Sequence, residues 1–515
     1  MNKAQIILKS KCIFTSLNEN PINGYIAICG NKIIKVSSGH IDSQLIDENT
    51  VVYNLGNKTI SPGFADSHVF FSGWMLRYIG FDLSSAKNTQ EMIDEIKQYS
   101  KTLNPKKTIF AHGYCFELNI AELQILNELY VESPIVLFSQ DGESFWINEA
   151  SRNHYGFDLD ADCNEVFWKL IEEVLDDHDF SKKLYKDYVS LLNSRGVTMV
   201  KEIGYDTFST FTQVLEELED NSELTLRVNF MSQPVKEGAN FEYGRLMRDK
   251  FRGDFVRFSG FNRMTDGSIS QMDGFLKEPY NNTDIYCNLD IDWERIESEV
   301  LEADANDFRF SLNAQGNAAV AKVINIFSKC KKDINNHLVN RHAITEAEYA
   351  DVVDIEKMGK LGLICEFYPQ IQAISDYDSK VNMIKDKIGL KRGKNYWNRR
   401  KMLDFGVYTC CGTDLPLVID DIPKSFFHTV TGKFSKNTRA FNAENTLSVE
   451  EILKAWTIGG AYDMYREAEL GTIEVGKLAD IAVFDKNIFE TDIDDMDTVK
   501  ICFTIVDGKI VYNNL

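Results

Sequence analysis

An alternation of strand-like and helix-like segments in the middle of the chain most constrains its fold. Residues 196–200 and 309–313 are short runs rich in strand-forming residues, and each lies beside a helix-like stretch. In the helix-like residues 318–331, apolar side chains recur three to four residues apart, at Val320, Val323, Ile324 and Phe327. This alternation predicts a parallel sheet or barrel covered by helices.

Both ends of the chain are instead rich in strands. Residues 5–8, 24–28 and 33–36 are apolar and β-branched, as are residues 479–484, 501–506 and 510–512. We therefore expect residues 1–60 and 466–515 to form one composite β-sandwich domain. The long segment at about 75–180 reads as a largely helical insertion into the α/β region.

Composition limits the partners of the chain. Its 515 residues carry a formal net charge of −22, which repels nucleic acid and anionic membranes. We find no apolar run of about 18 residues and no signal peptide, so we expect a cytoplasmic protein without a membrane partner. A small-molecule substrate is favoured, and a homodimer stays open.

The segment Ile60 to Phe70 suggests the kind of site. Residues two apart in a strand point to the same face, so His68 and Phe70 share one face. Two histidines at this spacing could hold one metal ion inside a barrel. Phe70 cannot bind a metal, so only half of such a pair is present.

An ordered set of motifs resembles the family 3 amidohydrolases, the group that includes N-substituted formamide deformylases. The motifs are Ser61-Pro62-Gly63-Phe64-Ala65-Asp66-Ser67-His68, Gly196-Val197-Thr198, Asp266-Gly267-Ser268, Gly412-Thr413-Asp414 and Leu470-Gly471-Thr472 through Asp480. The resemblance implies an α/β fold, a TIM-like (β/α)8 barrel at residues 61–465 with the small β-sandwich domain formed from both termini.

Several family metal positions are changed in this sequence. Phe70 replaces the second histidine of the first strand, and Asn262 replaces the lysine that is carboxylated to bridge two metals. Asn313 stands where the family has a further histidine ligand. A two-metal site needs a bridging anion and ligands on both sides. The resemblance therefore argues against a binuclear site here.

Three positions match the family. His68 and His342 match metal-binding histidines, and Asp414 matches the aspartate that takes a proton from metal-bound water. One divalent metal, zinc, on these three residues is the first interpretation, because two histidines and a carboxylate form a known catalytic zinc site. The alternative is a metal-free pocket in which the three residues are held by hydrogen bonds.

Other polar residues are candidates for catalysis or substrate binding. Lys201 follows the strand at 196–200, where its ammonium could hold an oxyanion. A surface ion pair with Glu202 or a neighbour is the alternative. Glu143 matches a family histidine near the substrate, and Asn148 either binds substrate or caps a helix. Phe70, Asn262 and Asn313 would line the substrate pocket.

The leading hypothesis is a hydrolase that acts on a carbon–nitrogen bond, other than a peptide bond, of a small molecule. A diverged metal-free isomerase or lyase is the second hypothesis, motivated by the lost ligands. A non-catalytic barrel that binds a small molecule is the third. Nothing in the sequence names the substrate.

Overall fold

The structure is a computed structural model, and it describes residues 3–103, 107–140, 144–157, 170–171, 177–204, 209–234, 238–416 and 422–515. The chain forms two compact units. The first contains residues 1–69, 189–206 and 215–515, and the second contains residues 70–188 and 207–214. No helix in the described ranges is both long enough and apolar enough to cross a membrane.

An eight-stranded parallel sheet forms the barrel of the first unit. Its order is β6-β11-β12-β13-β14-β15-β16-β17. The strands are β6 (Phe64–Val69), β11 (Val197–Gly204), β12 (Arg227–Ser232), β13 (Val256–Met264), β14 (Phe310–Ala314), β15 (Ala343–Glu346), β16 (Ile364–Phe367) and β17 (Tyr408–Cys411). The predicted TIM-like barrel is confirmed.

The first and last strands meet beyond their regular pairing. The N–H group of Asp414 donates to the carbonyl of His68 at 2.9 Å, and Val69 pairs with Leu415. The buried carboxylate of Asp66 accepts hydrogen bonds from the backbone and hydroxyl of Thr413. These contacts nearly close the barrel and bring the ends of β6 and β17 together.

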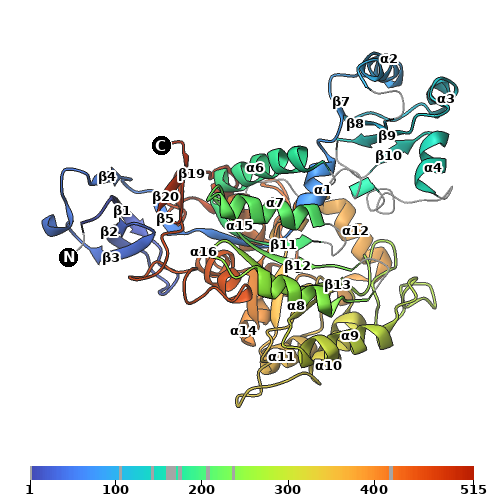
Figure 1. The fold of residues 1–515 in the computed structure, drawn as a ribbon. Coiled ribbons are helices and arrows are strands. Elements are labelled where there is room, and N and C mark those ends of the chain that lie inside the picture. The colour runs from blue at the N-terminus through green and yellow to red at the C-terminus, as the bar shows by residue number, and fades with distance from the viewer. Residues whose placement is uncertain are drawn as a thin grey trace. The chain divides into compact units, whose positions relative to one another are not determined.

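Helices connect the barrel strands, and others follow the last strand, β17 (Figure 1). They are α7 (Ser209–Asp220), α8 (Phe241–Lys250), α9 (Trp293–Ala305), α10 (Asn317–Phe327), α11 (Val352–Leu361), α12 (Tyr377–Lys387), α13 (Leu390–Gly393), α14 (Arg399–Asp404), α15 (Ile422–Thr431), α16 (Val449–Lys454) and α17 (Gly460–Asp463). The stripe Val320, Val323, Ile324 and Phe327 of α10 is buried in an apolar core with β14 and α11, as its spacing predicted.

Strands from both ends of the chain form a second sheet in the first unit. The blue N-terminal strands and the red C-terminal strands lie side by side in Figure 1. They are β1 (Ile6–Ile13), β2 (Ile22–Cys29), β3 (Lys32–Ser38), β4 (Val51–Asn54), β5 (Thr59–Pro62), β18 (Ile481–Phe484), β19 (Ile501–Val506) and β20 (Lys509–Asn513). The predicted α/β class with a separate β domain from both termini is confirmed.

The second unit has its own small sheet, in the order β10-β9-β8-β7. Its elements are α1 (Phe71–Leu76), β7 (Phe81–Asp82), α2 (Thr89–Ser100), β8 (Ile109–Tyr114), α3 (Ile120–Leu129), β9 (Ile135–Ser139), β10 (Phe145–Ile147), α4 (Glu149–Tyr155) and most of α6 (His178–Ser194). Apolar residues of α2, α3, β8 and β9 form its core. This segment therefore contains a sheet in addition to the helices that the sequence predicted.

Candidate active site

Polar side chains gather where the barrel strands end. His68 lies near the end of β6, Asn262 and Asn313 lie near the ends of β13 and β14, and Glu346 ends β15. Asp414 follows β17. Because the strands are parallel, their carboxyl ends share one face of the barrel, which is where TIM-barrel enzymes hold their active sites. We call this the C-terminal face.

His68 is oriented by a carboxylate from inside the barrel. Its Nδ1 atom lies 3.6 Å from Oε2 of Glu366 on β16, and its ring centroid lies 5.2 Å from that of Tyr368. Both His68 and Glu366 are buried. With Nδ1 directed at Glu366, Nε2 is the imidazole atom that can act on a ligand, the arrangement seen where a carboxylate orients a catalytic or metal-binding histidine.

Glu366 belongs to a buried network of two carboxylates and two cationic side chains. Lys201 and Arg309 each contact Glu366 and Asp463, with Lys201 Nζ 2.8 Å from Asp463 and Arg309 Nη2 2.8 Å from Glu366. Burial alone would raise the pKa of Glu366. Lys201, His68 and Arg309 outweigh it and lower this pKa to about 2. Glu366 therefore stays ionised beside His68.

The sequence analysis left two roles open for Lys201, oxyanion binding and a surface ion pair. The structure buries its side chain completely, at 0% exposure, and pairs it with Glu366 and Asp463. The ion pair is therefore internal, and Glu202 is not its partner. Lys201 contacts Glu366, and Glu366 in turn faces His68, so Lys201 affects the site indirectly.

Two acids stand together on the C-terminal face. Burial raises the pKa of Glu346 well above its ordinary value, and the charges of Asp414 and Glu348 add to that rise, whereas Asn313 opposes it. Burial also raises the pKa of Asp414, which His68 opposes. A pair of desolvated carboxylates favours either a proton or a bound cation.

Several buried polar atoms on this face lack a hydrogen-bond partner among the described residues. They are Oδ1 of Asn262, Oδ1 of Asn313, Oγ1 of Thr345, Oε2 of Glu346 and the hydroxyl of Tyr368. Asn262 uses its amide nitrogen to donate to Gln233 at 2.5 Å. Buried polar groups are seldom left unpaired, so such a cluster marks a place where a ligand or water binds.

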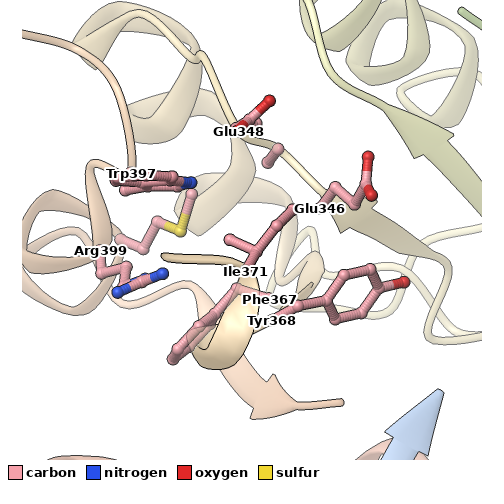
Figure 2. A pocket seen from close by; sticks show the side chains of 9 residues that line it. Glu346, Glu348, Phe367, Tyr368, Ile371, Trp397 and Arg399 are labelled. Atoms are coloured by element: carbon pink, nitrogen blue, oxygen red, sulfur yellow. The ribbon is translucent and has the colours of Figure 1, made fainter. Parts of the chain in front are cut away.

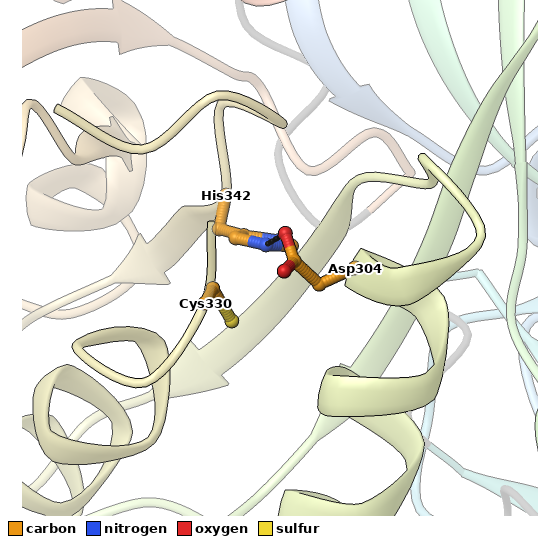
Figure 3. A group of neighbouring side chains, drawn as sticks. All are labelled: Asp304, Cys330 and His342. Carbon is orange, nitrogen blue, oxygen red and sulfur yellow. Dashed lines mark hydrogen bonds and ion pairs between the residues drawn. The ribbon is translucent and has the colours of Figure 1, made fainter. Parts of the chain in front are cut away.

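His342 lies at the opposite end of the barrel from His68. It precedes β15, so it is on the N-terminal face, where its Nε2 lies 3.1 Å from Oδ1 of Asp304. Figure 3 shows these two side chains with Cys330. The ligand atoms of the three lie within 4.8 Å of one another, close enough to hold a metal ion. The structure does not bring His342 together with His68 and Asp414.

Hydrogen bonds already use the side-chain polar atoms of His342 and Asp304 in this N-terminal cluster. Nδ1 of His342 accepts from the N–H of Phe310 at 3.0 Å, so the ring proton sits on Nε2 and points at Asp304. Asp304 also accepts from Asn340 and from the N–H of Lys331. A metal on Nε2 would place a proton on Nδ1, facing another donor. This cluster therefore has a structural role, in which its hydrogen bonds hold neighbouring segments together.

The comparison with known families decides the relationship. The profile of the amidohydrolase family matches residues 51–512. This chain belongs to the amidohydrolase family. The match spans the barrel and the terminal sheet from β4 onward, without β1, β2 and β3, and it confirms the resemblance inferred from the ordered motifs.

Individual relatives are distant but extend along most of this amidohydrolase. It is 21% identical to Protein LONG AFTER FAR-RED 3 of Arabidopsis thaliana, over 99% of this chain and 92% of the relative. It is 20% identical to N-substituted formamide deformylase of Arthrobacter pascens, over 95% and 93%. An uncharacterized metal-dependent hydrolase from Pyrococcus horikoshii superposes with a TM-score of 0.74 at 18% identity, over 95% and 99% of the two chains.

Members of the family typically use metal ions, and the C-terminal face has only part of the ligand set for a pair of them. Phe70 and Asn262 offer no ligand where a two-metal site needs one, and Asn262 cannot be carboxylated. Donor groups for one ion are present in His68, Glu346 and Asp414. Within the described ranges their ligand atoms do not meet the spacing found at the N-terminal cluster. The face therefore has three donor groups, which would have to come closer together to hold one ion, and too few for two ions.

A small pocket opens beside these residues in the amidohydrolase (Figure 2). Glu346 and Tyr368 line one side of it, Trp397 and Arg399 line the other, and Ile371 lies between them. Its wall combines aromatic and charged side chains from β15, β16 and the start of α14. An apolar wall with a few polar groups is the lining that small-molecule sites share.

The remaining predicted residues lie in or near the second unit. Phe70 precedes α1, and Asn148 caps α4 through its bond to the N–H of Ser151. Asn148 also bonds the backbone of Ile135, Tyr130 and Ser133. All its hydrogen-bonding capacity is thus used within that unit, as a capping residue. Glu143 lies outside the described residues.

Sequence reasoning missed Glu346 and Glu366. Glu346 ends β15 and so reaches the C-terminal face, whereas His342 precedes that strand. The signal was the strand boundary itself: with residues 343–346 read as a strand, the side chain at its carboxyl end is Glu346. Glu366 lies within the apolar strand β16, where a carboxylate requires a buried partner.

Proposed function

We propose that this amidohydrolase cleaves a carbon–nitrogen bond, other than a peptide bond, in a small-molecule amide. The observation that carries the proposal is the oriented histidine: Glu366 faces Nδ1 of His68, beside the acids Glu346 and Asp414 at the carboxyl ends of the strands. An imidazole that is oriented by a carboxylate and lies next to titratable acids can carry out general acid–base catalysis.

The site would hold one divalent metal ion, zinc in the first instance, on His68, Glu346 and Asp414. Glu346 takes the place that the sequence analysis gave to His342. When bound, the ion would polarise the amide carbonyl and lower the pKa of a bound water. Support comes from the acid pair Glu346 and Asp414: the charge of Asp414 raises the pKa of Glu346, and a cation relieves this repulsion.

The side chains of the C-terminal face would share the remaining work. Asp414 takes a proton from the attacking water, because it lies next to His68, whose charge acts on its carboxylate. Burial, with the charges of Asp414, Glu346 and Glu366, raises the pKa of Tyr368 well above its ordinary value, so this phenol stays protonated. It can then donate a hydrogen bond to the substrate carbonyl. Asn262 and Asn313 offer amide groups for orienting the substrate.

Lys201 would support this chemistry as a positioning residue. Its contacts with Glu366 and Asp463 hold Glu366 ionised, and Glu366 in turn directs His68. The earlier hypothesis that Lys201 binds an oxyanion directly requires its ammonium to leave both carboxylates. The positioning role needs no such movement.

A panel of N-substituted formamides and acetamides tests the function, with amine release as the readout and protein supplied with zinc or manganese. We expect turnover by the wild type and a loss of kcat of about 10²–10⁴-fold in Asp414→Asn, the range for removal of a general base. Asp304→Asn is the matched control, since Asp304 is also a buried acid but lies on the other face. No amine from any substrate with either metal would contradict the proposal.

A metal-free isomerase or lyase is the second candidate, favoured by Phe70, Asn262 and Asn313 at former ligand positions. It would use His68 and Asp414 as acid and base without an ion. Full activity after treatment with a chelator would support it, whereas activity restored only by added metal would exclude it. Ligand-dependent stabilisation without any turnover would instead indicate a binding protein.

A further inference from the structure

Arg399 is a buried cation without an acid. The residue is 4% exposed, and its guanidinium lies 5.2 Å from the ring centroid of Phe367 and 5.9 Å from that of Trp397. Its Nη1 donates to Oε1 of Gln372 at 3.0 Å. Its Nε has no hydrogen-bond partner in the described part of the chain. Its direct contacts are therefore neutral, and the carboxylate of Glu348, which lines the same pocket, acts on its charge only from a distance.

Other buried arginines of the same unit are neutralised. Arg227 pairs with Asp480 and Asp507, and Arg309 pairs with Glu366 and Asp463. Across the described ranges, no carboxylate lies within 4.0 Å of Arg399. An unpaired buried charge is strongly unfavourable. Consistently, burial lowers the pKa of Arg399 to about 10.

The unpaired donors face the pocket beside the C-terminal face. Arg399 and Trp397 both line it, and Figure 2 shows the indole nitrogen of Trp397 directed toward its middle. This indole N–H is buried and also lacks a partner among the described residues. Phe367 and Ile371 supply apolar wall between these donors and Glu346. The pocket thus has a cationic end and an acidic end.

We propose that Arg399 and Trp397 form a carboxylate-binding subsite, so that the ligand of this pocket is a small carboxylic acid. The planar guanidinium fork matches the two oxygens of a carboxylate. One negative charge balances the one unpaired positive charge, whereas a doubly charged phosphate would exceed it in a protein of net charge −22. If the proposed function also holds, the substrate is an amide that carries a carboxylate.

Calorimetric titration with sodium propionate tests the subsite, with propionamide as the neutral isostere and inorganic phosphate as the other anion, all at constant ionic strength. We expect propionate to bind the wild-type protein. Propionamide and phosphate should bind at least about tenfold more weakly, since a charge-assisted hydrogen bond contributes on this scale. No propionate binding, or preference for phosphate, would overturn the proposal.

Two variants locate the site. Arg399→Met should weaken propionate binding about tenfold or more and should still fold, because it removes an unpaired buried charge. Arg400→Met is the matched control: it removes the same charge from the next residue, which pairs with Glu451, and should bind propionate as the wild type does. Unchanged binding by Arg399→Met would place the anion elsewhere.

Arg399→Lys provides a second check should the methionine variant not fold. It keeps the charge and loses the planar fork, so propionate binding should weaken while the preference over propionamide remains. Equal binding of propionate and propionamide by the wild type would contradict a charged subsite. Because binding is measured without turnover, a protein that binds propionate and cleaves no amide would retain the subsite and lose the proposed function.

Discussion

The two faces of the barrel each hold a histidine beside acids, and they differ in how their polar atoms are paired. On the N-terminal face, both ring nitrogens of His342 and the carboxylate of Asp304 are hydrogen-bonded within the protein. On the C-terminal face, Oε2 of Glu346 and neighbouring amide oxygens have no partner among the described residues.

This difference separates stability from function. A fully paired buried cluster stabilises the fold and has no capacity left for a ligand. A partly paired cluster costs stability and retains the capacity to bind. The same residue types thus serve a structural role at one end of the barrel and are available for chemistry at the other.

The largest expected effect on stability comes from the buried network of Glu366, Asp463, Lys201 and Arg309. Lys201→Met would leave Glu366 and Asp463 with Arg309 as the remaining cation of the network. We expect a loss of about 3–5 kcal/mol in the free energy of unfolding, the scale for breaking a buried ion pair. Urea denaturation measures it. Lys250→Met, which breaks an exposed pair with Glu216, should cost less than about 1 kcal/mol. Equal small losses would show that the buried network does not support the barrel.

Substitution of His342 in the N-terminal cluster should destabilise the protein. His342→Ala leaves the N–H of Phe310 and one acceptor position of Asp304 unpaired. We expect a loss of about 1–3 kcal/mol in the free energy of unfolding, the range for stranded buried polar groups. Ligand binding at the C-terminal face should be unchanged. A variant that is as stable as the wild type but loses ligand binding would reverse the roles assigned to the two faces.

Substitution of one member of the acid pair Glu346 and Asp414 should stabilise the protein. Glu346→Gln removes one of two mutually repelling carboxylates, so we expect a gain of about 1 kcal/mol in the free energy of unfolding, since one pKa unit corresponds to about 1.4 kcal/mol. The variant should lose activity, as expected where function requires a destabilised site. A less stable variant would show that Glu346 is a structural residue.

A pH titration gives the smallest expected effect. Burial lowers the pKa of His342 below its ordinary value of 6.5, an effect that Asp304 opposes. The native imidazole therefore stays neutral below pH 6.5 while the unfolded chain takes up a proton, and stability falls as pH decreases. The stability difference between wild type and His342→Asn should shrink below pH 6.5. A difference that is constant from pH 7.5 to 5.5 would contradict the neutral assignment.

The sequence predicted the barrel and the terminal sheet because both leave long, regular signals. The apolar stripe of α10 and the strand-rich ends are examples. It also predicted His68 and Asp414 as residues of one site, and the backbone bond between them places them side by side. These residues sit within ordered motifs whose position along the strands is clear.

The sequence did not reveal which end of a strand each side chain occupies. His342 and Glu346 are four residues apart on either end of β15, and only the boundary of that strand assigns them to opposite faces. Lys201 and Glu366 are 165 residues apart in sequence, so their contact follows from barrel closure. Long-range pairing of buried charges leaves no local pattern in the chain.

Metal titration tests the central claim most directly, that the C-terminal face holds one ion and the N-terminal cluster holds none. Chelator-treated protein would be titrated with zinc by calorimetry, alongside Glu346→Gln and Cys330→Ser. We predict one bound ion per chain in the wild type and in Cys330→Ser, and loss of that ion in Glu346→Gln. Binding that persists in Glu346→Gln and disappears in Cys330→Ser, or no binding by the wild type, would contradict the account.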